Sequence, residues 1–279
     1  MCVTKITVLP PGTLSAVKKR VDTLLAERGL FESRSRAAAA VLAGGVRLGG
    51  EGRRVQKPGQ LVPEDVELAV EERPPFVSRG GVKLANALEA LGVDPRGRRA
   101  LDVGASTGGF TDCLLQAGAA HVVAVDVAYG ELDWKLRTDP RVTVIERRNA
   151  RSLDCAELPY PPDLVVVDVS FISLRMVLPA ALACAAPSFD CLALVKPQFE
   201  VGRGRVGKGG VVRSVEDRRA ALVSVAAHAR DELGLSVLGC APSGLPGPAG
   251  NRESFVWIAE PGRPGAVEDL ERAARRAEP

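Results

Sequence analysis

The chain has 279 residues, of which 46% are hydrophobic, 25% charged and only 4% aromatic. This composition is typical of a soluble globular protein with one large or two smaller domains, and it argues against a disordered chain. The longest apolar run, 176–187, is too short to cross a bilayer, and no signal peptide is evident. We therefore expect a cytoplasmic protein with no membrane partner.

The charge is unevenly distributed along the chain. Residues 1–60 contain 11 Lys or Arg and 4 Asp or Glu, a balance of +7, so a total of +3 leaves the remainder at −4. A basic segment on a mildly acidic body is compatible with a polyanion partner. A chance excess on a solvated surface explains the charge equally well, and composition leaves both interpretations open.

The cysteines and histidines show no pattern of a metal site. The cysteines form no CxxC pair, several stand among apolar residues, and the two histidines, His121 and His228, are far apart. We expect buried free thiols in a reducing compartment, and no bound metal. The six cysteines are at positions 2, 113, 155, 184, 191 and 240.

A small α+β unit is expected over residues 18–72, after a leader at 1–17 that is either disordered or an extended start. Val21, Leu24 and Leu25 follow helical spacing, and Ser33 is placed to cap a second helix over 34–42. The pair Gly44-Gly45 ends that helix. Short strands are expected at 46–48, at 55 and at 66–70.

This unit resembles a known RNA-binding domain. The stretch RVDTLLAERGLFESRSRAAAAVLAGGVRLGG, with VQKPGQLV after it, is similar to the S4 domain. The resemblance implies that the second helix and the following turn face structured RNA. Basic side chains there would contact phosphates, although Arg34 and Arg36 could instead simply solvate a short helix. The candidates for RNA contact are Arg20, Arg34, Arg36, Arg47 and Lys57.

A second domain is expected over 78–262, after a proline-containing linker at 73–77 and before a C-terminal helix or tail at 263–279. Strand-like apolar runs alternate with helical segments, which predicts an α/β Rossmann-like fold with a mostly parallel seven-stranded sheet. The connection 242–250 is too short for a helical crossover, so the last two strands should pair antiparallel. The strands are expected at 100–103, 122–127, 142–146, 164–169, 192–195, 235–240 and 254–258, and the helices at 82–91, 109–116, 174–183 and 215–233.

A glycine-rich turn, ALDVGASTGGF at 100–110, follows the first of these strands. Its glycines do not have the G-x-G-x-x-G spacing of a dinucleotide-binding turn. The D-x-G-x-x-x-G-G-F form resembles motif I of S-adenosylmethionine-dependent methyltransferases, which implies that the turn surrounds the methionine end of that cofactor. The candidate cofactor residues here are Asp102, Gly104, Ala105, Ser106, Thr107, Gly108, Gly109 and Phe110.

Further cofactor candidates follow the next strands. Asp126 ends the second strand, where an acid would bind the ribose hydroxyls of the adenosine, and Val127 is next to it. A turn or helix-cap role is the plainer alternative for Asp126. Asn149 and Ala150, after the third strand, would lie beside the adenine. Asp168, after the fourth strand, is the last candidate cofactor residue.

A lysine stands at the mouth of an apolar strand. The strand 192–195 runs into Lys196 and is stopped by Pro197. A lysine partly removed from water loses proton affinity and can act as a general base. Lys83, Asp168 and Glu253 should converge on the same sheet edge, although each alone could form an ordinary surface salt bridge.

The set of Lys83, Asp168, Lys196 and Glu253 resembles the catalytic tetrad of FtsJ-like ribose 2′-O-methyltransferases. With SRGGVKL, LDVGASTGGFTD, VVDVSFISL, LVKPQFEVGRGRVGKGGVV and PGPAGNRESF, the chain resembles the TlyA family over about residues 20–260. The resemblance implies methylation of cytidine 2′-hydroxyls in ribosomal RNA. Lys196 would lower the barrier to attack, Asp168 and Lys83 would orient it, and Glu253 would hold the acceptor ribose. Which member removes the proton stays open.

The glycine-rich loop 200–212 carries Arg203 and Arg205, which are further candidates for RNA contact. The loop is either a mobile RNA clamp or a plain surface loop. The expected partner is ribosomal RNA or a ribosomal subunit, with no obligate protein partner. The competing hypotheses are a non-catalytic RNA-binding or ribosome-assembly factor, a haemolysin, and an enzyme that methylates small-molecule hydroxyls.

Overall fold

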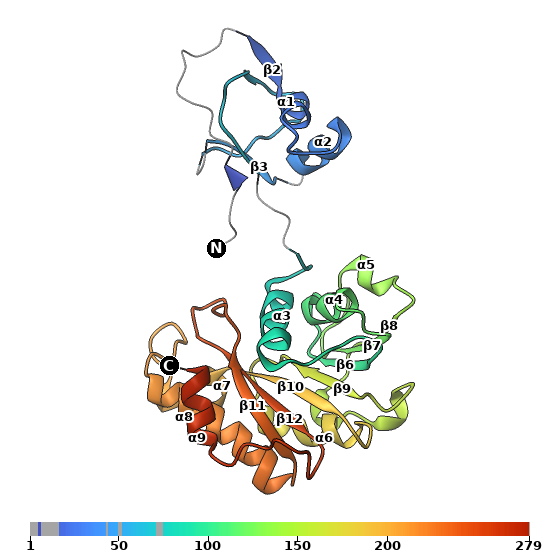
Figure 1. The fold of residues 1–279 in the computed structure, drawn as a ribbon, viewed down its shortest axis with the longest axis vertical. Helices are drawn as coiled ribbons and strands as arrows, with labels where there is room; N and C mark the ends of the chain where they lie inside the picture. The colour runs from blue at the N-terminus through green and yellow to red at the C-terminus, as the bar shows by residue number, and fades with distance from the viewer. Residues whose placement is uncertain (1–4, 7–16, 43, 50–51, 71–74, 279) are drawn as a thin grey trace. The chain divides into compact units, whose positions relative to one another are not determined.

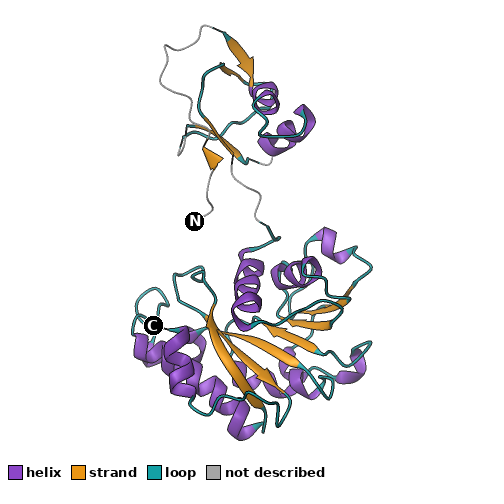
Figure 2. Cartoon of the chain, viewed as in Figure 1, coloured by secondary structure: helices purple, strands orange, loops and turns teal. Residues whose placement is uncertain are grey.

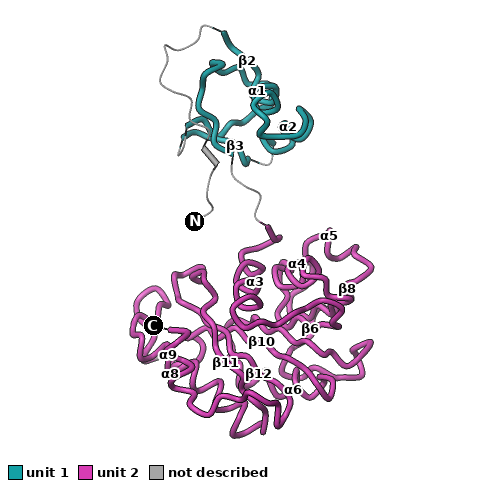
Figure 3. The backbone as a smooth tube through the Cα atoms, in the orientation of Figure 1, with its two compact units in different colours: residues 1–74 teal, residues 75–279 magenta. Residues whose placement is uncertain are grey.

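The computed structural model describes residues 5–6, 17–42, 44–49, 52–70 and 75–278, without the side chains of 5, 6 and 203. The chain divides into two compact units, residues 1–74 and 75–279 (Figure 3). Each unit has its own core, and each is described by itself.

The first unit is a small α+β domain. Its core joins Val21, Leu24 and Leu25 of one helix to Ala37 and Val41 of the next, which confirms the expected helical spacing. Two small antiparallel sheets, β1-β5-β3 and β2-β4, flank the helices. The elements are β1 (Lys5–Ile6), β2 (Lys18–Arg20), α1 (Val21–Glu27), α2 (Arg34–Leu42), β3 (Val46–Leu48), β4 (Leu61–Pro63) and β5 (Leu68–Val70).

Several expectations for this unit need correction. The leader 1–17 lies mostly outside the described residues, but Lys5–Ile6 forms β1 and pairs with β5, so this dipeptide is not disordered. Val55 is buried without forming a strand, and β2 and β4 were not anticipated. Strands of two or three residues carry too little alternation to be found from sequence.

The second unit is a seven-stranded sheet covered by helices on both faces (Figures 1 and 2). The strand order is β11-β12-β10-β9-β6-β7-β8, and β12 runs antiparallel to both of its neighbours, β10 and β11. The other pairs are parallel. The strands are β6 (Arg99–Val103), β7 (His121–Val125), β8 (Val142–Ile145), β9 (Leu164–Val167), β10 (Asp190–Val195), β11 (Ser236–Pro242) and β12 (Ser254–Ala259).

Each strand supplies side chains to two separate cores because successive residues point to opposite faces. Leu101 and Val103 pack with α6, α8 and α9, whereas Ala100 packs with α3, α4 and α5. The expected mostly parallel α/β fold is therefore confirmed. The helices are α3 (Arg79–Leu91), α4 (Gly109–Gln116), α5 (Trp134–Arg137), α6 (Leu178–Ala183), α7 (Pro197–Glu200), α8 (Val215–Ala227) and α9 (Leu270–Ala277).

Short turns of helix complete the unit. The expected helix 174–183 divides into a 3-10 turn, η3 (Leu174–Met176), and α6, and the expected helix 215–233 ends in a π-helical turn, η5 (His228–Glu232). The other 3-10 turns are η1 (Ala150–Ser152), η2 (Cys155–Glu157) and η4 (Arg203–Arg205). The residues 75–77, expected to be linker, begin the second unit, where Phe76 and Val77 pack against the core that α3 and α4 share.

The cysteines differ from the sequence expectation at one place. Cys155 and Cys184 form a disulfide, whereas Cys113, Cys191 and Cys240 are free. The two bonded cysteines are 29 residues apart in sequence, and only the packing of η2 against the end of α6 brings them together. Sequence spacing alone carries no sign of that contact. Cys2 lies outside the described residues.

The sheet has one topological switch point that positions the site. From β6 the chain proceeds outward through β7 and β8, then returns to β9 on the other side of β6. The loops after β6 and β9 therefore diverge, and they open a crevice at the carboxyl ends of the parallel strands. Because β12 is antiparallel, its first residues, rather than its last, lie at this edge.

Candidate active site

The glycine-rich turn after β6 is held against the neighbouring loop. Gly104 has a φ of 85°, and a Cβ there would lie 2.4 Å from the carbonyl oxygen of Asp168. Gly108, with a φ of 95°, precedes α4, and its Cβ would lie 2.3 Å from Leu136. At Gly104 only glycine accommodates both the left-handed backbone and the nearby carbonyl, whereas at Gly108 the left-handed backbone is the main reason for glycine.

Two adjoining cavities open along the carboxyl edge of the sheet. The larger has a volume of about 710 Å³, and the smaller about 480 Å³. They share wall residues from the loops that follow β6 and β9, which makes one continuous site on both sides of the switch point. The shared residues are Gly104, Ser106, Asp168, Ser170 and Phe171.

The smaller cavity contains the residues expected beside an adenosine. Asp126, Val127, Asn149 and Ala150 all line it. The carboxylate of Asp126 accepts hydrogen bonds from the backbone amides of Ser106 and Ala128, each at 2.7 Å. These bonds fix the acid at the cavity wall, where its remaining lone pairs can accept hydroxyl donors.

The larger cavity contains most of the remaining turn residues together with all four of the tetrad. Gly104, Ala105, Ser106, Thr107, Gly109 and Phe110 line it. The structure does not bring Asp102 and Gly108 to either wall. Asp102 is fully buried behind the turn, where its Oδ2 accepts a hydrogen bond from Thr111 Oγ1 at 2.7 Å.

Asp102 is a carboxyl group in an unfavourable place for a charge. Its Oδ1 is buried and has no hydrogen-bond partner among the described residues. Burial raises the pKa of Asp102 to about 7, and the charges of Asp168 and Asp126 act in the same direction. The hydrogen bond from Thr111 opposes this shift without cancelling it.

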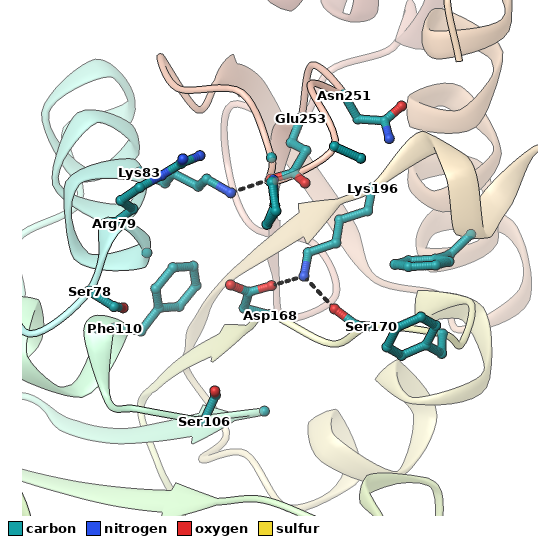
Figure 4. Close-up of a pocket in the computed structure, with 18 of the residues that line it drawn as sticks. Ser78, Arg79, Lys83, Ser106, Phe110, Asp168, Ser170, Lys196, Asn251 and Glu253 are labelled. Atoms are coloured by element: carbon teal, nitrogen blue, oxygen red, sulfur yellow. Dashed lines mark hydrogen bonds and ion pairs between the residues drawn. The ribbon is translucent and has the colours of Figure 1, made fainter. Parts of the chain in front are cut away.

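Two lysine–carboxylate pairs face the larger cavity (Figure 4). Lys83 Nζ, from α3, lies 2.5 Å from Glu253 Oε2, just before β12. Lys196 Nζ, after β10, lies 2.5 Å from Asp168 Oδ1, after β9. The structure thus brings together the four residues that sequence analysis grouped from distant segments.

The two pairs differ in their exposure and in their further partners. The side chains of Lys83 and Glu253 are 7% and 1% exposed, whereas those of Lys196 and Asp168 are 12% and 22% exposed. Lys196 also donates a hydrogen bond to Ser170 Oγ at 2.9 Å. Opposite charges brought out of water compensate each other, so each contact fixes the position of both side chains.

Sequence analysis missed Phe171, which lies at the junction of the two cavities. Its side chain is 91% exposed, its φ is 65°, and its ring centroid lies 5.3 Å from that of Phe199. A left-handed backbone is uncommon for a bulky residue and often marks a functional position. Phe171 lies within the motif VVDVSFISL, but nothing in those residues sets its ring apart from the other apolar side chains of the loop.

Glu200 joins the loop after β9 to the helix after β10. Its buried carboxylate accepts hydrogen bonds from Ser173 Oγ at 2.6 Å and from the Leu174 amide at 2.8 Å. Burial raises the pKa of Glu200. These bonds hold the loop that carries Ser170 and Phe171 against α7, and so fix the cavity mouth.

In the first unit, two of the arginines expected to bind RNA lie near one buried acid, Asp22. Arg20 forms two hydrogen bonds with the carboxylate of Asp22, at 2.9 and 2.6 Å, and Arg34 Nε lies 3.7 Å from the same group. Arg36 is 72% exposed on α2, beside Glu32. Arg34 and Arg36 therefore begin one helix and face solvent.

The remaining basic candidates are more scattered. Lys57 is exposed, and Arg47 is half-buried, with a hydrogen bond to the Gly52 carbonyl at 3.5 Å. In the glycine-rich loop, Arg205 is 58% exposed and lies 3.5 Å from Asp217. The side chain of Arg203 lies outside the described part of the chain.

The histidines have ordinary side-chain partners. His121 Nδ1 lies 2.7 Å from Tyr160 Oη, and His228 Nδ1 lies 3.1 Å from Glu232. Within the described ranges, no group of three or more His, Cys, Asp or Glu side chains is arranged to hold a metal ion. No helix in the same ranges is both long and apolar enough to span a membrane.

Both units of the chain match known protein families. Residues 76–260 match the model of the FtsJ-like methyltransferase family, and residues 19–68 match the S4 domain. The chain is therefore a methyltransferase with an N-terminal S4 domain, as its two folds and the paired cavities indicate.

Similarity to individual proteins shows which methyltransferase family the chain belongs to. The chain is 49% identical over 265 residues to the 16S/23S rRNA (cytidine-2′-O)-methyltransferase TlyA of Mycobacterium tuberculosis, covering 94% of this chain and 98% of that protein. It is 43% identical to YqxC of Bacillus subtilis, named as a candidate rRNA methyltransferase, covering 89% and 88%. A solved structure of a candidate hemolysin from Streptococcus thermophilus is 38% identical, with a TM-score of 0.70 and coverage of 95% and 96%. The chain belongs to the TlyA family.

Proposed function

We propose that this enzyme transfers a methyl group from S-adenosylmethionine to the ribose 2′-hydroxyl of a cytidine in ribosomal RNA. The observation that carries the proposal is the pair of lysine–carboxylate contacts on the wall of a cavity adjoining the cofactor turn. The names of the mycobacterial and Bacillus relatives and the S4 domain support an RNA substrate.

The residues present fit S-adenosylmethionine. A Cβ at Gly104 would collide with the Asp168 carbonyl. The absence of a side chain there lets the loops after β6 and β9 approach each other at the switch point. Asp126 would accept the ribose hydroxyls, and Asn149 would lie beside the adenine. When bound, the cofactor supplies an electrophilic methyl group on a sulfonium.

We assign Lys196 the task of removing the proton from the acceptor hydroxyl. A ribose hydroxyl is a very weak acid, so its oxygen needs to lose its proton as the bond to the methyl carbon forms. Lys196 assists that loss, and its contacts with Asp168 and Ser170 aim Nζ into the cavity. Lys196 would first release its own proton to solvent and then, as a neutral amine, accept the proton of the hydroxyl, while the bound cofactor would supply the methyl group.

The second pair would hold the acceptor ribose. Lys83 binds Glu253 Oε2, and the neighbouring loop approaches the other carboxylate oxygen so closely that a Cβ at Gly247 would lie 2.4 Å from Oε1. Fixed carboxylate oxygens can accept a hydrogen bond from a ribose hydroxyl and set its direction of attack.

The aromatic pair would hold the acceptor base. Phe171 presents an exposed ring at the mouth of the cavity, and Phe199 lies beside it. Stacking of a nucleobase on an aromatic ring contributes about 1–3 kcal/mol and is the usual way proteins hold unpaired bases. This feature favours a nucleoside over a small aliphatic alcohol as the acceptor.

Transfer of labelled methyl from S-adenosylmethionine to isolated ribosomal subunits tests the proposal. We expect wild type to label ribosomal RNA and Lys196→Ala to be at least about 100-fold slower, as loss of proton-transfer assistance implies. Lys196→Arg keeps the positive charge but cannot accept a proton at ordinary pH, so it should also fail.

The controls separate catalysis from binding. Cofactor and RNA affinities of Lys196→Ala should stay near those of wild type, because the ion pair lies on one wall of a larger site. A wild type that labels no RNA under these conditions, with the variants unchanged, would favour the non-catalytic assembly factor. Lysis of red cells by purified protein would favour the haemolysin reading.

A further inference from the structure

The side chain of Asn251 joins two segments at the mouth of the larger cavity. It is only 1% exposed, and both ends of its amide are used. Oδ1 accepts a hydrogen bond from the Val212 amide at 2.9 Å, and Nδ2 donates to the Gly210 carbonyl at 2.8 Å. Asn251 therefore fastens the glycine-rich loop to the segment that carries Glu253, two residues further on.

The loop has few other internal restraints at this point. The Gly207 amide donates to the Val211 carbonyl at 3.1 Å and the Gly210 amide to the Gly207 carbonyl at 3.0 Å, and Gly209 and Gly210 both have positive φ angles. Glycine backbones are conformationally permissive, so the folded position of such a loop depends on added contacts. Gly210 and Asn251 both line the larger cavity.

A second brace holds the far end of the loop. Arg218 on α8 donates a hydrogen bond to the Arg213 carbonyl at 2.7 Å and forms a buried ion pair with Glu278 at 2.9 Å. Glu278 in turn accepts a hydrogen bond from Ser254 Oγ at 2.9 Å, next to Glu253. The loop and the start of β12 are thus joined twice, once by Asn251 and once through Arg218 and Glu278.

We propose that Asn251 is a positioning residue that holds the glycine-rich loop against the acceptor side of the site, so that substrate RNA meets a preformed wall. This inference rests on the proposed function for the identity of the substrate. The loop's attachment itself is independent of it. Without Asn251 the loop should open, and RNA binding should then include the cost of ordering it again.

Limited trypsin digestion measures loop opening directly, because Arg205 and Lys208 stand in the loop as cleavage sites. We expect Asn251→Ala to be cut between residues 203 and 213 at least about tenfold faster than wild type, since two buried hydrogen bonds are lost. Asn251→Asp keeps the acceptor for the Val212 amide and loses the donor to Gly210. Its cleavage rate should fall between the two.

A matched control is available on α3. Asn86 Nδ2 donates to the Ser243 carbonyl at 2.9 Å, which tethers the connection between β11 and β12, where Asn251 also lies, but not the glycine-rich loop. Asn86→Ala should leave cleavage of the loop at the wild-type rate. Cleavage of folded Asn251→Ala at the wild-type rate, with Asn251→Asp equally resistant, would overturn the proposal.

Kinetics give a second and separate readout. For methylation of ribosomal subunits, Asn251→Ala should raise KM for RNA about tenfold while changing kcat and cofactor affinity by less than about threefold. A fall in kcat with unchanged KM would also overturn the positioning role. If wild type methylates no RNA, the proposed function fails, whereas the digestion experiment still decides the attachment of the loop.

Discussion

At the scale of single residues, the carboxylates of the site have different surroundings and therefore different tasks. Asp168 and Glu253 each have a lysine partner at 2.5 Å, and Asp126 accepts two backbone amides. Asp102 is fully buried and has Thr111 as its hydrogen-bond donor. The first three acids are held in place by these partners at the cavity, whereas burial behind the cavity raises the pKa of Asp102 and favours its neutral form.

Asp102 should therefore make the stability of the second unit depend on pH. Its pKa is about 7 when folded and near 3.8 when unfolded, so the folded state holds an extra proton between these values. The free energy of unfolding should fall as pH rises from about 4 to about 7. Asp102→Asn removes this term, and at pH 8 it should be more stable than wild type by up to about 4 kcal/mol.

Urea unfolding followed by tryptophan fluorescence measures this effect, because Trp134 and Trp257 both lie in the second unit. The two proteins should have similar stability near pH 4.5 and diverge as pH rises. A difference between wild type and Asp102→Asn that stays constant from pH 4.5 to pH 8 would show that Asp102 is not a buried neutral acid.

At the scale of elements, the turn between β6 and α4 depends on one close approach of backbones. Gly104→Ala would place a methyl group 2.4 Å from the Asp168 carbonyl, and the backbone φ of 85° is itself unfavourable for alanine. The loops after β6 and β9 would have to separate. We expect at least a 30-fold loss of S-adenosylmethionine affinity by calorimetry, with the helix content retained.

Gly130 provides the matched control for that substitution. Its φ of 77° is equally left-handed, but a Cβ there has no atom within 4 Å. Gly130→Ala should therefore carry the backbone strain without the collision and keep most of the cofactor affinity. Equal losses in Gly104→Ala and Gly130→Ala would mean that strain alone, not the close approach, accounts for the effect.

Much of this element structure is predictable from the sequence. The seven strands of the second unit and α4 are long, apolar and bounded by glycines or charges, so periodicity finds them. The antiparallel pairing of β11 and β12 follows from the short connection 242–250. The brief α5 and α7, and strands such as β2 and β4, depend on tertiary contacts that no local pattern reveals.

The sequence predicts which residues form the site, but not which of their side chains contact each other. Chain order and strand ends bring Lys83, Asp168, Lys196 and Glu253 to one edge, yet nothing in the sequence pairs Lys83 with Glu253 and Lys196 with Asp168. Phe171 and Asn251 were missed for a similar reason. Their importance lies in one exposed ring and in two backbone contacts, and both arise only on folding.

At the scale of the whole molecule, the S4 domain should supply RNA affinity that the methyltransferase domain uses. Arg34 and Arg36 are exposed at the start of α2, and Asp22 keeps Arg20 as its partner when Arg34 is removed. We expect Arg34→Ala with Arg36→Ala to weaken RNA binding and to make the slope of log affinity against log salt shallower by about 1–2.

Arg96→Ala is a suitable control for the loss of an exposed arginine, because Arg96 is 79% exposed on the second unit and lies 3.1 Å from Asp94, two residues away. It should leave the salt slope as in wild type. An unchanged slope in the double variant would mean that the arginines of α2 do not contact phosphates.

Removal of residues 1–74 should abolish RNA binding, and methylation that persists without them would favour a small-molecule acceptor.

The most direct test of the central claim is the position of the transferred methyl group. Ribosomal RNA treated with wild type or with Lys196→Ala is digested to nucleosides and analysed by mass spectrometry. Our account predicts 2′-O-methylcytidine in the wild-type sample and its absence in the Lys196→Ala sample. A methyl group found on a base, or an equal amount of 2′-O-methylcytidine with both proteins, would contradict the account.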